Sequence, residues 1–77
     1  MSENIYRLIG KNIKNYRLKN NISGANLAEL SGYSYEFIRK IESPNSKFGF
    51  SIETVYQISK ALKINISCLF EGVKTYE

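Results

Sequence analysis

Residues 24–43 of this 77-residue chain read GANLAELSGYSYEFIRKIES. Apolar residues recur at helical spacing on both sides of Gly32, which marks a short break between the two runs. Two serines are placed to cap the helices on either side: Ser23 for a helix predicted at 24–31, and Ser34 for one predicted at 35–42. Helices joined by so tight a glycine-containing turn must cross at a large angle, which predicts a helix-turn-helix motif.

The residue types within the motif agree with that geometry. A small residue, Ala28, allows the two helices to pack closely, and Gly32 can adopt the positive φ that the turn requires. The remaining apolar residues are predicted to point inward and to anchor the pair to a core: Leu27, Leu30, Ile38 and Ile41. The opposite face of the helix at 35–42 is then left exposed.

Apolar spacing predicts three more helices, at 3–20, 52–62 and 66–71. Asn20-Asn21, Gly72 and a Ser51 cap mark their ends, with Glu53 in a first turn that favours an acid. The predicted apolar stripes are Ile5, Leu8, Ile9, Ile13 and Tyr16 on the first helix, and Ile52, Val55, Ile58 and Leu62 on the fourth. Residues 43–50 are predicted as a loop and 74–77 as a frayed tail. No segment alternates with period 2, so we expect one all-α domain over residues 1–77.

The residue types that are missing exclude several classes of function. The sequence has no His and no Asp, which excludes a Ser-His-Asp triad and a His-based zinc site, so we expect no enzyme, metal or cofactor. The lone Cys68 fits a reducing compartment and is interpreted as a small apolar residue rather than a redox switch. Neither a signal peptide nor a membrane span is expected, and we predict a cytoplasmic protein.

Charge points to a class of partner. The net charge is +4, and residues 1–19 hold five basic residues against Glu3 alone. Such an asymmetry favours a polyanion as partner, although mild basicity also serves solubility. Arg7, Lys11 and Lys14 form a basic stripe that would contact peripheral phosphates or be a solvated face; a membrane-surface helix is disfavoured because the core needs the helix's apolar face.

From Ile9 to Gly72 the chain resembles the Cro/phage-repressor type of helix-turn-helix domain, the XRE family. The resemblance lies in the order, spacing and length of several strings: IGKNIKNYR at 9–17, LAELSGYS at 27–34, IRKIE at 38–42, SIETV at 51–55, SKALKI at 59–64 and ISCLF at 66–70. It implies a compact five-helix, lambda-repressor-like domain that binds double-stranded DNA, with the helix-turn-helix at its second and third helices.

In such domains the third helix enters the major groove of DNA. Carried over by position, the base-contacting candidates are Tyr35, Glu36, Arg39 and Lys40. Lys40 can donate to guanine, Glu36 can accept from cytosine N4, and Tyr35 can pack on a thymine methyl or contact a phosphate. The phosphate-contacting candidates are Arg17, Gly24, Ser34 and Lys47.

Three positions carry further expectations. Arg17 and Glu42 match positions that form an ion pair in related repressors, which would fix the recognition helix and could aim Arg17 at a phosphate. The family usually has Gln where this chain has Gly24, so only a backbone contact remains there. In the long 43–50 loop, we expect either Phe48 or Phe50 to enter the core and the other, if exposed, to form a partner surface.

The resemblance implies a sequence-specific transcriptional regulator that acts as a homodimer on a two-fold operator. The dimer would use a C-terminal segment at 64–73, with Ile66, Leu69 and Phe70 at its interface. The alternative is a protein-interaction module, such as an antitoxin or anti-regulator, with a regulatory protein as partner. Exposed aromatic residues in the loop and recognition helix would favour that alternative.

Overall fold

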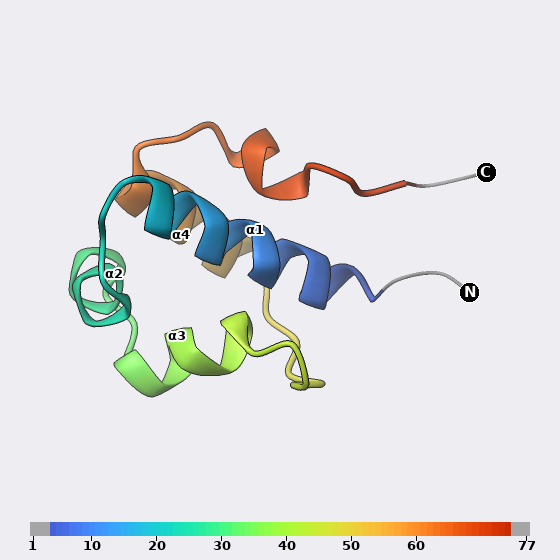
Figure 1. Cartoon of the computed structure of the whole chain (residues 1–77), viewed down its shortest axis with the longest axis horizontal. Helices are drawn as coiled ribbons and strands as arrows, with labels where there is room; N and C mark the ends of the chain where they lie inside the picture. The colour runs from blue at the N-terminus through green and yellow to red at the C-terminus, as the bar shows by residue number, and fades with distance from the viewer. Residues whose placement is uncertain (1–3, 75–77) are drawn as a thin grey trace.

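The computed structural model describes residues 4–74 and contains, over that range, four α-helices and one 3₁₀ helix. These are α1 (Ile5–Lys19), α2 (Gly24–Ser31), α3 (Tyr35–Glu42), α4 (Ile52–Leu62) and η1 (Ile66–Phe70). In Figure 1, α1 crosses the middle of the molecule with η1 on one side, α3 on the other and α4 behind it. The all-α lambda-repressor-like fold is confirmed, and its fifth helix is the single 3₁₀ element.

The predicted bounds of α2, α3 and α4 are confirmed because local capping determines where those helices begin. Ser23, Ser34 and Ser51 each accept a hydrogen bond from the backbone N–H three residues on, at 3.0–3.2 Å. α1 begins at Ile5, two residues later than predicted, because the side chain of Asn4 caps it by accepting the Tyr6 N–H at 2.8 Å. The first residue of the predicted helix, Glu3, and residues 75–77 of the predicted tail lie outside the described part.

Four described residues have a left-handed backbone conformation, each at or just after the end of a helix. Gly32 has φ +84°, as the turn between α2 and α3 requires, and Asn21 has φ +58° after the end of α1. Gly72, predicted to end the last helix, has φ +85° after η1, and Lys63, which no local signal indicated, caps α4 with φ +59°.

The core is one cluster to which all five helices contribute. Its buried apolar residues are Ile9, Ile13, Leu27, Ala28, Ile38, Ile41, Val55, Ile58, Leu62 and Leu69. Where α1 crosses α3, Gly10 is buried so closely that a Cβ there would collide with the Ile41 carbonyl. The recognition helix is therefore packed directly against the α1 backbone.

Three residues predicted to point inward are exposed instead: Ile5, Leu30 and Ile52. Leu30 is 60% exposed because the buried seam of α2 runs through Leu27, Ala28 and the half-buried Ser31, about 100° around the helix from it. Ile5 and Ile52 are the first residues of α1 and α4, ahead of the first core residues of those helices, Ile9 and Val55. Their periodic spacing is real, but it continues beyond the end of the core.

Both aromatic residues of the 43–50 loop pack against the body. Phe48 is half-buried, with its ring edge-on to Phe37 at 5.3 Å between centroids, and Phe50 lies edge-on to Tyr6 at 5.2 Å. Phe37 also stacks on Tyr33 at 4.9 Å. The expectation that one phenylalanine enters the core is met by both, which are half-buried against it, so neither is left over to form the partner surface that an exposed ring would have offered.

The C-terminal segment is fastened to α1 by a buried amide. Asn12 donates hydrogen bonds to the carbonyl oxygens of Leu69 and Glu71, both at 2.9 Å. The Tyr16 hydroxyl donates to the Glu71 carboxylate at 2.6 Å, which raises the pKa of Tyr16 above its usual range because the bond favours the protonated phenol. The lone Cys68, predicted to be buried, is half-buried beside this connection.

Candidate nucleic-acid interface

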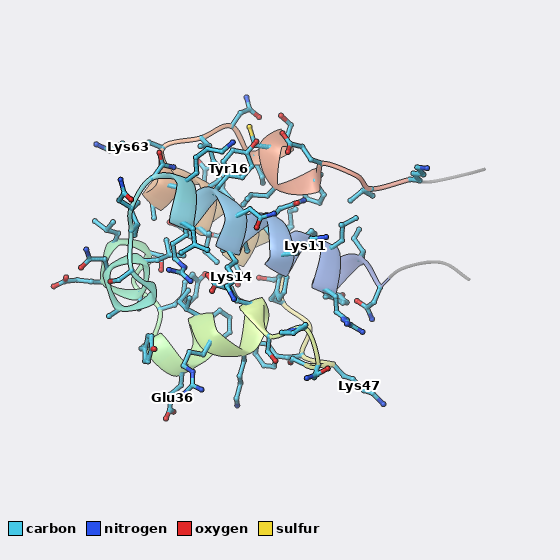
Figure 2. The ribbon with its side chains drawn as sticks, viewed as in Figure 1. Lys11, Lys14, Tyr16, Glu36, Lys47 and Lys63 are labelled. Carbon is cyan, nitrogen blue, oxygen red and sulfur yellow. The ribbon has the colours of Figure 1, made fainter. Side chains whose placement is uncertain are left out.

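One side of α3 is fixed in the core and the other is exposed. Ile38 and Ile41 are 1% and 3% exposed, whereas all four predicted base-contacting residues lie on the outer side: Tyr35, Glu36, Arg39 and Lys40. This division follows from the 3.6-residue helical period. Figure 2 shows Glu36 directed away from the body of the molecule, with Lys47 projecting from the loop on the same side.

The exposed side chains of α3 are ordered by their neighbours. The Arg39 guanidinium lies 5.9 Å from the Tyr35 ring centroid, and the Lys40 ammonium lies 5.6 Å from that of Phe48. Both distances fall within the range of cation–π attraction. A shallow hollow of about 380 Å³ lies against this face, lined by Glu36, Arg39, Lys40 and Ser43.

The amino ends of α2 and α3 are the natural anion-binding features of the motif. Ser23 and Ser34 use their hydroxyl oxygens to accept the N–H groups of Asn26 and Phe37. The first N–H groups of a helix have no partner within the helix, and the helix dipole places partial positive charge beside them. Gly24 and Ser34 thus have the setting that phosphate contact needs.

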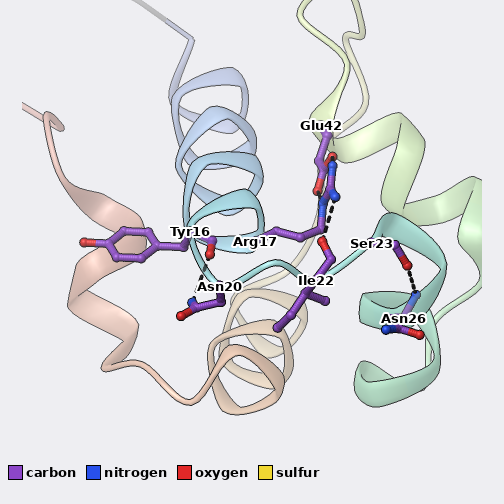
Figure 3. A network of polar contacts seen from close by, with 7 residues as sticks. All are labelled: Tyr16, Arg17, Asn20, Ile22, Ser23, Asn26 and Glu42. Atoms are coloured by element: carbon purple, nitrogen blue, oxygen red, sulfur yellow. Dashed lines mark hydrogen bonds and ion pairs between the residues drawn. The ribbon is translucent and has the colours of Figure 1, made fainter.

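The structure brings Arg17 and Glu42 together in a bidentate ion pair that ties three segments (Figure 3). Arg17 Nε and Nη2 donate to the two carboxylate oxygens of Glu42 at 2.8 and 2.9 Å, and Nη1 donates to the Ile22 carbonyl at 2.9 Å. The two side chains are only 11% and 9% exposed. The pairing with Glu42 raises the pKa of Arg17 above its ordinary value. The end of α3 is therefore fixed to α1 and to the segment before α2.

A second cationic surface lies on α1. Arg7, Lys11 and Lys14 are all exposed, and α1 itself holds no acidic residue. Figure 2 shows Lys11 and Lys14 on the face of α1 turned toward the viewer, whereas Glu36 and Lys47 point downward. The stripe therefore borders the outer face of α3 without being part of it.

One of the residues predicted for a dimer interface is not accessible on the surface of the monomer. Leu69 is 0% exposed, and its side chain belongs to the core of the monomer. Ile66 and Phe70 are half-buried against that core and keep part of their surface free. The prediction of Leu69 as an interface residue is wrong, because the turn of η1 directs it inward.

Sequence patterns missed the packing roles of three residues, one of which, Gly24, they had named only as a phosphate contact. Asn12 is buried among apolar neighbours, Gly10 permits the close crossing of α1 and α3, and Gly24 lies beneath the Tyr35 ring. A polar residue inside an apolar stripe was the available signal for Asn12. The two glycines gave no comparable signal, because what they contact comes from another helix.

Within residues 4–74, no helix combines the length and apolarity that crossing a membrane requires. In the same range, no three His, Cys, Asp or Glu side chains are grouped so that they could hold a metal ion.

A protein-family model described as a helix-turn-helix domain matches residues 10–74 of this chain. The matched range includes every element from α2 to η1 and most of α1. The chain belongs to the helix-turn-helix domain family. A search of curated protein sequences found no match. Solved structures agree with the family assignment and identify a DNA-binding domain of the Cro/phage-repressor type.

Three of these structures illustrate the similarity. The biofilm master regulator SinR, solved in complex with DNA, is 30% identical, with a TM-score of 0.73 over 82% of this chain and 98% of its own. The restriction-modification controller protein C.AhdI from Aeromonas hydrophila is 23% identical, with a TM-score of 0.77 over 84% and 96%. An HTH_3 family transcriptional regulator from Vibrio cholerae is 26% identical, with a TM-score of 0.79 over 90% of this chain and 38% of its own.

Proposed function

We propose that this helix-turn-helix domain is a sequence-specific regulator of transcription that binds double-stranded DNA. The observation that carries the proposal is the two-sided α3, whose inner side is fixed in the core while its outer side presents four polar or aromatic side chains. A helix held in this way can enter the major groove without losing conformational freedom on binding. In this role the protein catalyses no reaction and acts in the cytoplasm.

The outer side of α3 supplies the base contacts in this proposal. Lys40 and Arg39 donate to guanine O6 and N7, and Glu36 accepts from cytosine N4. Lys40 leaves its position over the Phe48 ring to reach a base, which is an inexpensive movement for an exposed lysine. Tyr35 lies at the amino end of α3, at the edge of the contacted bases.

Phosphate contacts position the domain on the duplex. The N–H of Gly24 and the hydroxyl of Ser34 lie at the two helix N-termini, and Lys47 adds a charge from the loop. Arg17 has five N–H groups and uses three within the fold, so it can share a phosphate while it still holds Glu42. Its burial makes it the most rigid of these donors.

The active form in this proposal is a homodimer on a two-fold operator, with half-sites about one helical turn apart. Segment 64–73 forms the interface through the free surfaces of Ile66 and Phe70. The alternative of a protein-interaction module loses the support of the loop, because Phe48 and Phe50 pack within the monomer, and keeps only the exposed Tyr35 of α3.

Selection from a random-sequence duplex pool tests the proposal. At about 100 mM salt we expect a recovered two-fold sequence, and the mass of the complex should equal two chains per duplex. Phosphate contacts release counterions, so affinity should fall steeply as salt rises. Failure to retain any duplex would refute DNA binding, and a complex of one chain per duplex would refute the dimer.

A substitution in α3 tests the assignment of the recognition face. Lys40→Ala should cost about 1–3 kcal/mol of binding free energy at one base position and relax the preference there. Lys60→Ala is the matched control, since Lys60 is an exposed lysine that also lies over an aromatic ring but belongs to α4. An unchanged selected sequence for Lys40→Ala would show that the face is wrongly assigned.

A further inference from the structure

The ring of Tyr35 lies directly on the backbone of Gly24. A Cβ at position 24 would be 3.0 Å from Cε1 and 3.6 Å from Cδ1 of that ring. Since 3.0 Å is shorter than an ordinary contact between carbon atoms, a Cβ at position 24 requires the ring to give way by a few tenths of an ångström, and a longer side chain requires more. Gly24 is the first residue of α2 and Tyr35 the first of α3, so the contact joins the amino ends of both helices of the motif.

Tyr35 is held without being covered. The side of the ring that faces α2 contacts Gly24, and the Arg39 guanidinium lies 5.9 Å from the ring centroid. The residue is nevertheless 51% exposed. An exposed aromatic side chain ordinarily samples several rotamers. Two neighbours restrict this one, so an exposed edge of the ring is presented in a fixed orientation on the outer side of α3.

Glycine is a poor choice for α2 unless the contact requires it. It is the least favourable helix residue after proline, because it gives up the most backbone freedom on folding. Gly24 has an ordinary helical position rather than a positive φ, so its backbone conformation does not call for glycine. The close approach of the Tyr35 ring is a reason for glycine at this position.

We propose that Gly24 is a positioning residue for Tyr35, and that the ring edge of Tyr35 distinguishes thymine from the other bases at the edge of each half-site. This inference rests on the proposed function. In the major groove only thymine offers a methyl group, and apolar contact with that methyl is the contact available to ring carbons. Gly24 therefore contributes to base preference through another residue, in addition to any backbone contact with phosphate.

Removal of the thymine methyl group tests the proposal. The selected duplex is compared with duplexes in which deoxyuridine replaces one thymine at a time, a change that deletes the C5-methyl and preserves pairing. At the position contacted by Tyr35, the wild-type protein should bind the uracil duplex about fourfold more weakly, the effect of one buried methyl group. Tyr35→Ala should bind both duplexes equally, whereas Tyr35→Phe should keep the preference.

The role of Gly24 has its own variants and control. Gly24→Gln should lose the same methyl preference because its side chain displaces the ring, and adding Tyr35→Ala should have no further effect on that preference. Gly49→Gln is the matched control, since a Cβ at Gly49 would lie 3.3 Å from the ring of Tyr6 on α1 and does not meet Tyr35. It should retain the preference. Circular dichroism confirms that each variant is folded, and the smaller Gly24→Ala change serves if Gly24→Gln does not fold.

The outcomes separate this inference from the proposed function. If no duplex is selected, DNA binding itself fails. If a duplex is selected and Tyr35→Ala still discriminates thymine from uracil, or no thymine is sensitive to its methyl, the role of Tyr35 is overturned. If Tyr35→Ala loses the preference and Gly24→Gln, or Gly24→Ala where the glutamine variant does not fold, keeps it, the positioning role of Gly24 is overturned.

Discussion

Arg17 connects α1, the segment before α2 and the end of α3 through hydrogen bonds to Ile22 and Glu42. A charged group that is only 11% exposed would be unfavourable without a partner, since burial removes most of its hydration. The bidentate geometry supplies that partner and fixes the direction of both side chains. The pair therefore determines where the carboxyl end of the recognition helix lies.

Removal of the carboxylate should be costly. We expect Glu42→Ala to lower the free energy of unfolding by about 3 kcal/mol, because Arg17 remains buried without a partner. Urea denaturation followed by circular dichroism measures the change. Glu53→Ala is the control, since Glu53 is exposed and its carboxylate accepts a hydrogen bond from Gln57 at 2.8 Å. It should shift stability by about 0.5 kcal/mol or less.

A double-mutant cycle distinguishes a buried ion pair from two independent charges. Replacement of both partners by apolar residues, Arg17→Met with Glu42→Leu, should recover much of the stability lost by Glu42→Ala. If the double variant lost as much stability as Arg17→Met and Glu42→Leu lose together when measured singly, the two residues would not act as a coupled buried pair.

At the scale of the element, η1 depends on α1 for its position. Five residues in 3₁₀ conformation have little stability of their own, and the Leu69 and Glu71 carbonyl groups need donors. The Asn12 amide provides one donor to each, across more than fifty residues of sequence. A single side chain thus supplies two hydrogen bonds that hold the segment proposed for dimerisation against α1, in addition to the Tyr16–Glu71 bond and the buried Leu69.

Loss of that amide should loosen η1 more than the rest of the domain. Asn12→Ala should lower the free energy of unfolding by about 1–3 kcal/mol, the cost of leaving a buried acceptor unpaired. Amide hydrogen exchange should accelerate first over residues 66–73. Asn15→Ala is the control, because Asn15 is exposed on the same helix. Uniform acceleration across all helices would show that η1 has no separate dependence on Asn12.

The elements were predictable where their signals are local. Serine caps and Gly32 determined α2, α3 and α4, since each acts within a few residues of the chain. The exposure of Leu30 and Ile52 was not predictable from spacing, because spacing does not show which part of an apolar stripe meets the core. The contact of Gly24 with Tyr35 is likewise tertiary, so the residues of the candidate site could be named from sequence but their coupling could not.

At the scale of the whole molecule, the distribution of charge matters more than its net value of +4. Glu42 is paired with Arg17, and Glu71 accepts a hydrogen bond from Tyr16, so two of the acids are engaged within the fold. On the outer side of α3, Glu36 is the acid that opposes Arg39, Lys40 and the nearby Lys47. This face should therefore attract a polyanion, with Glu36 as a local source of discrimination.

Two exposed lysines on opposite sides of the molecule allow a test of whether the face of α3 attracts DNA. Lys47 projects on the side of α3, and Lys63 points away from the opposite side (Figure 2). Lys47→Gln should weaken binding to all duplexes alike and reduce the slope of log affinity against log salt by about 1 per protomer, because one phosphate contact is lost. Fluorescence anisotropy between 50 and 200 mM salt measures both slopes. Lys63→Gln removes the same charge and should leave the slope unchanged, since Lys63 projects from the side of the molecule opposite to Lys47 and should make no phosphate contact. Equal slopes for the two variants would mean that net charge, and not the face of α3, governs the encounter with DNA.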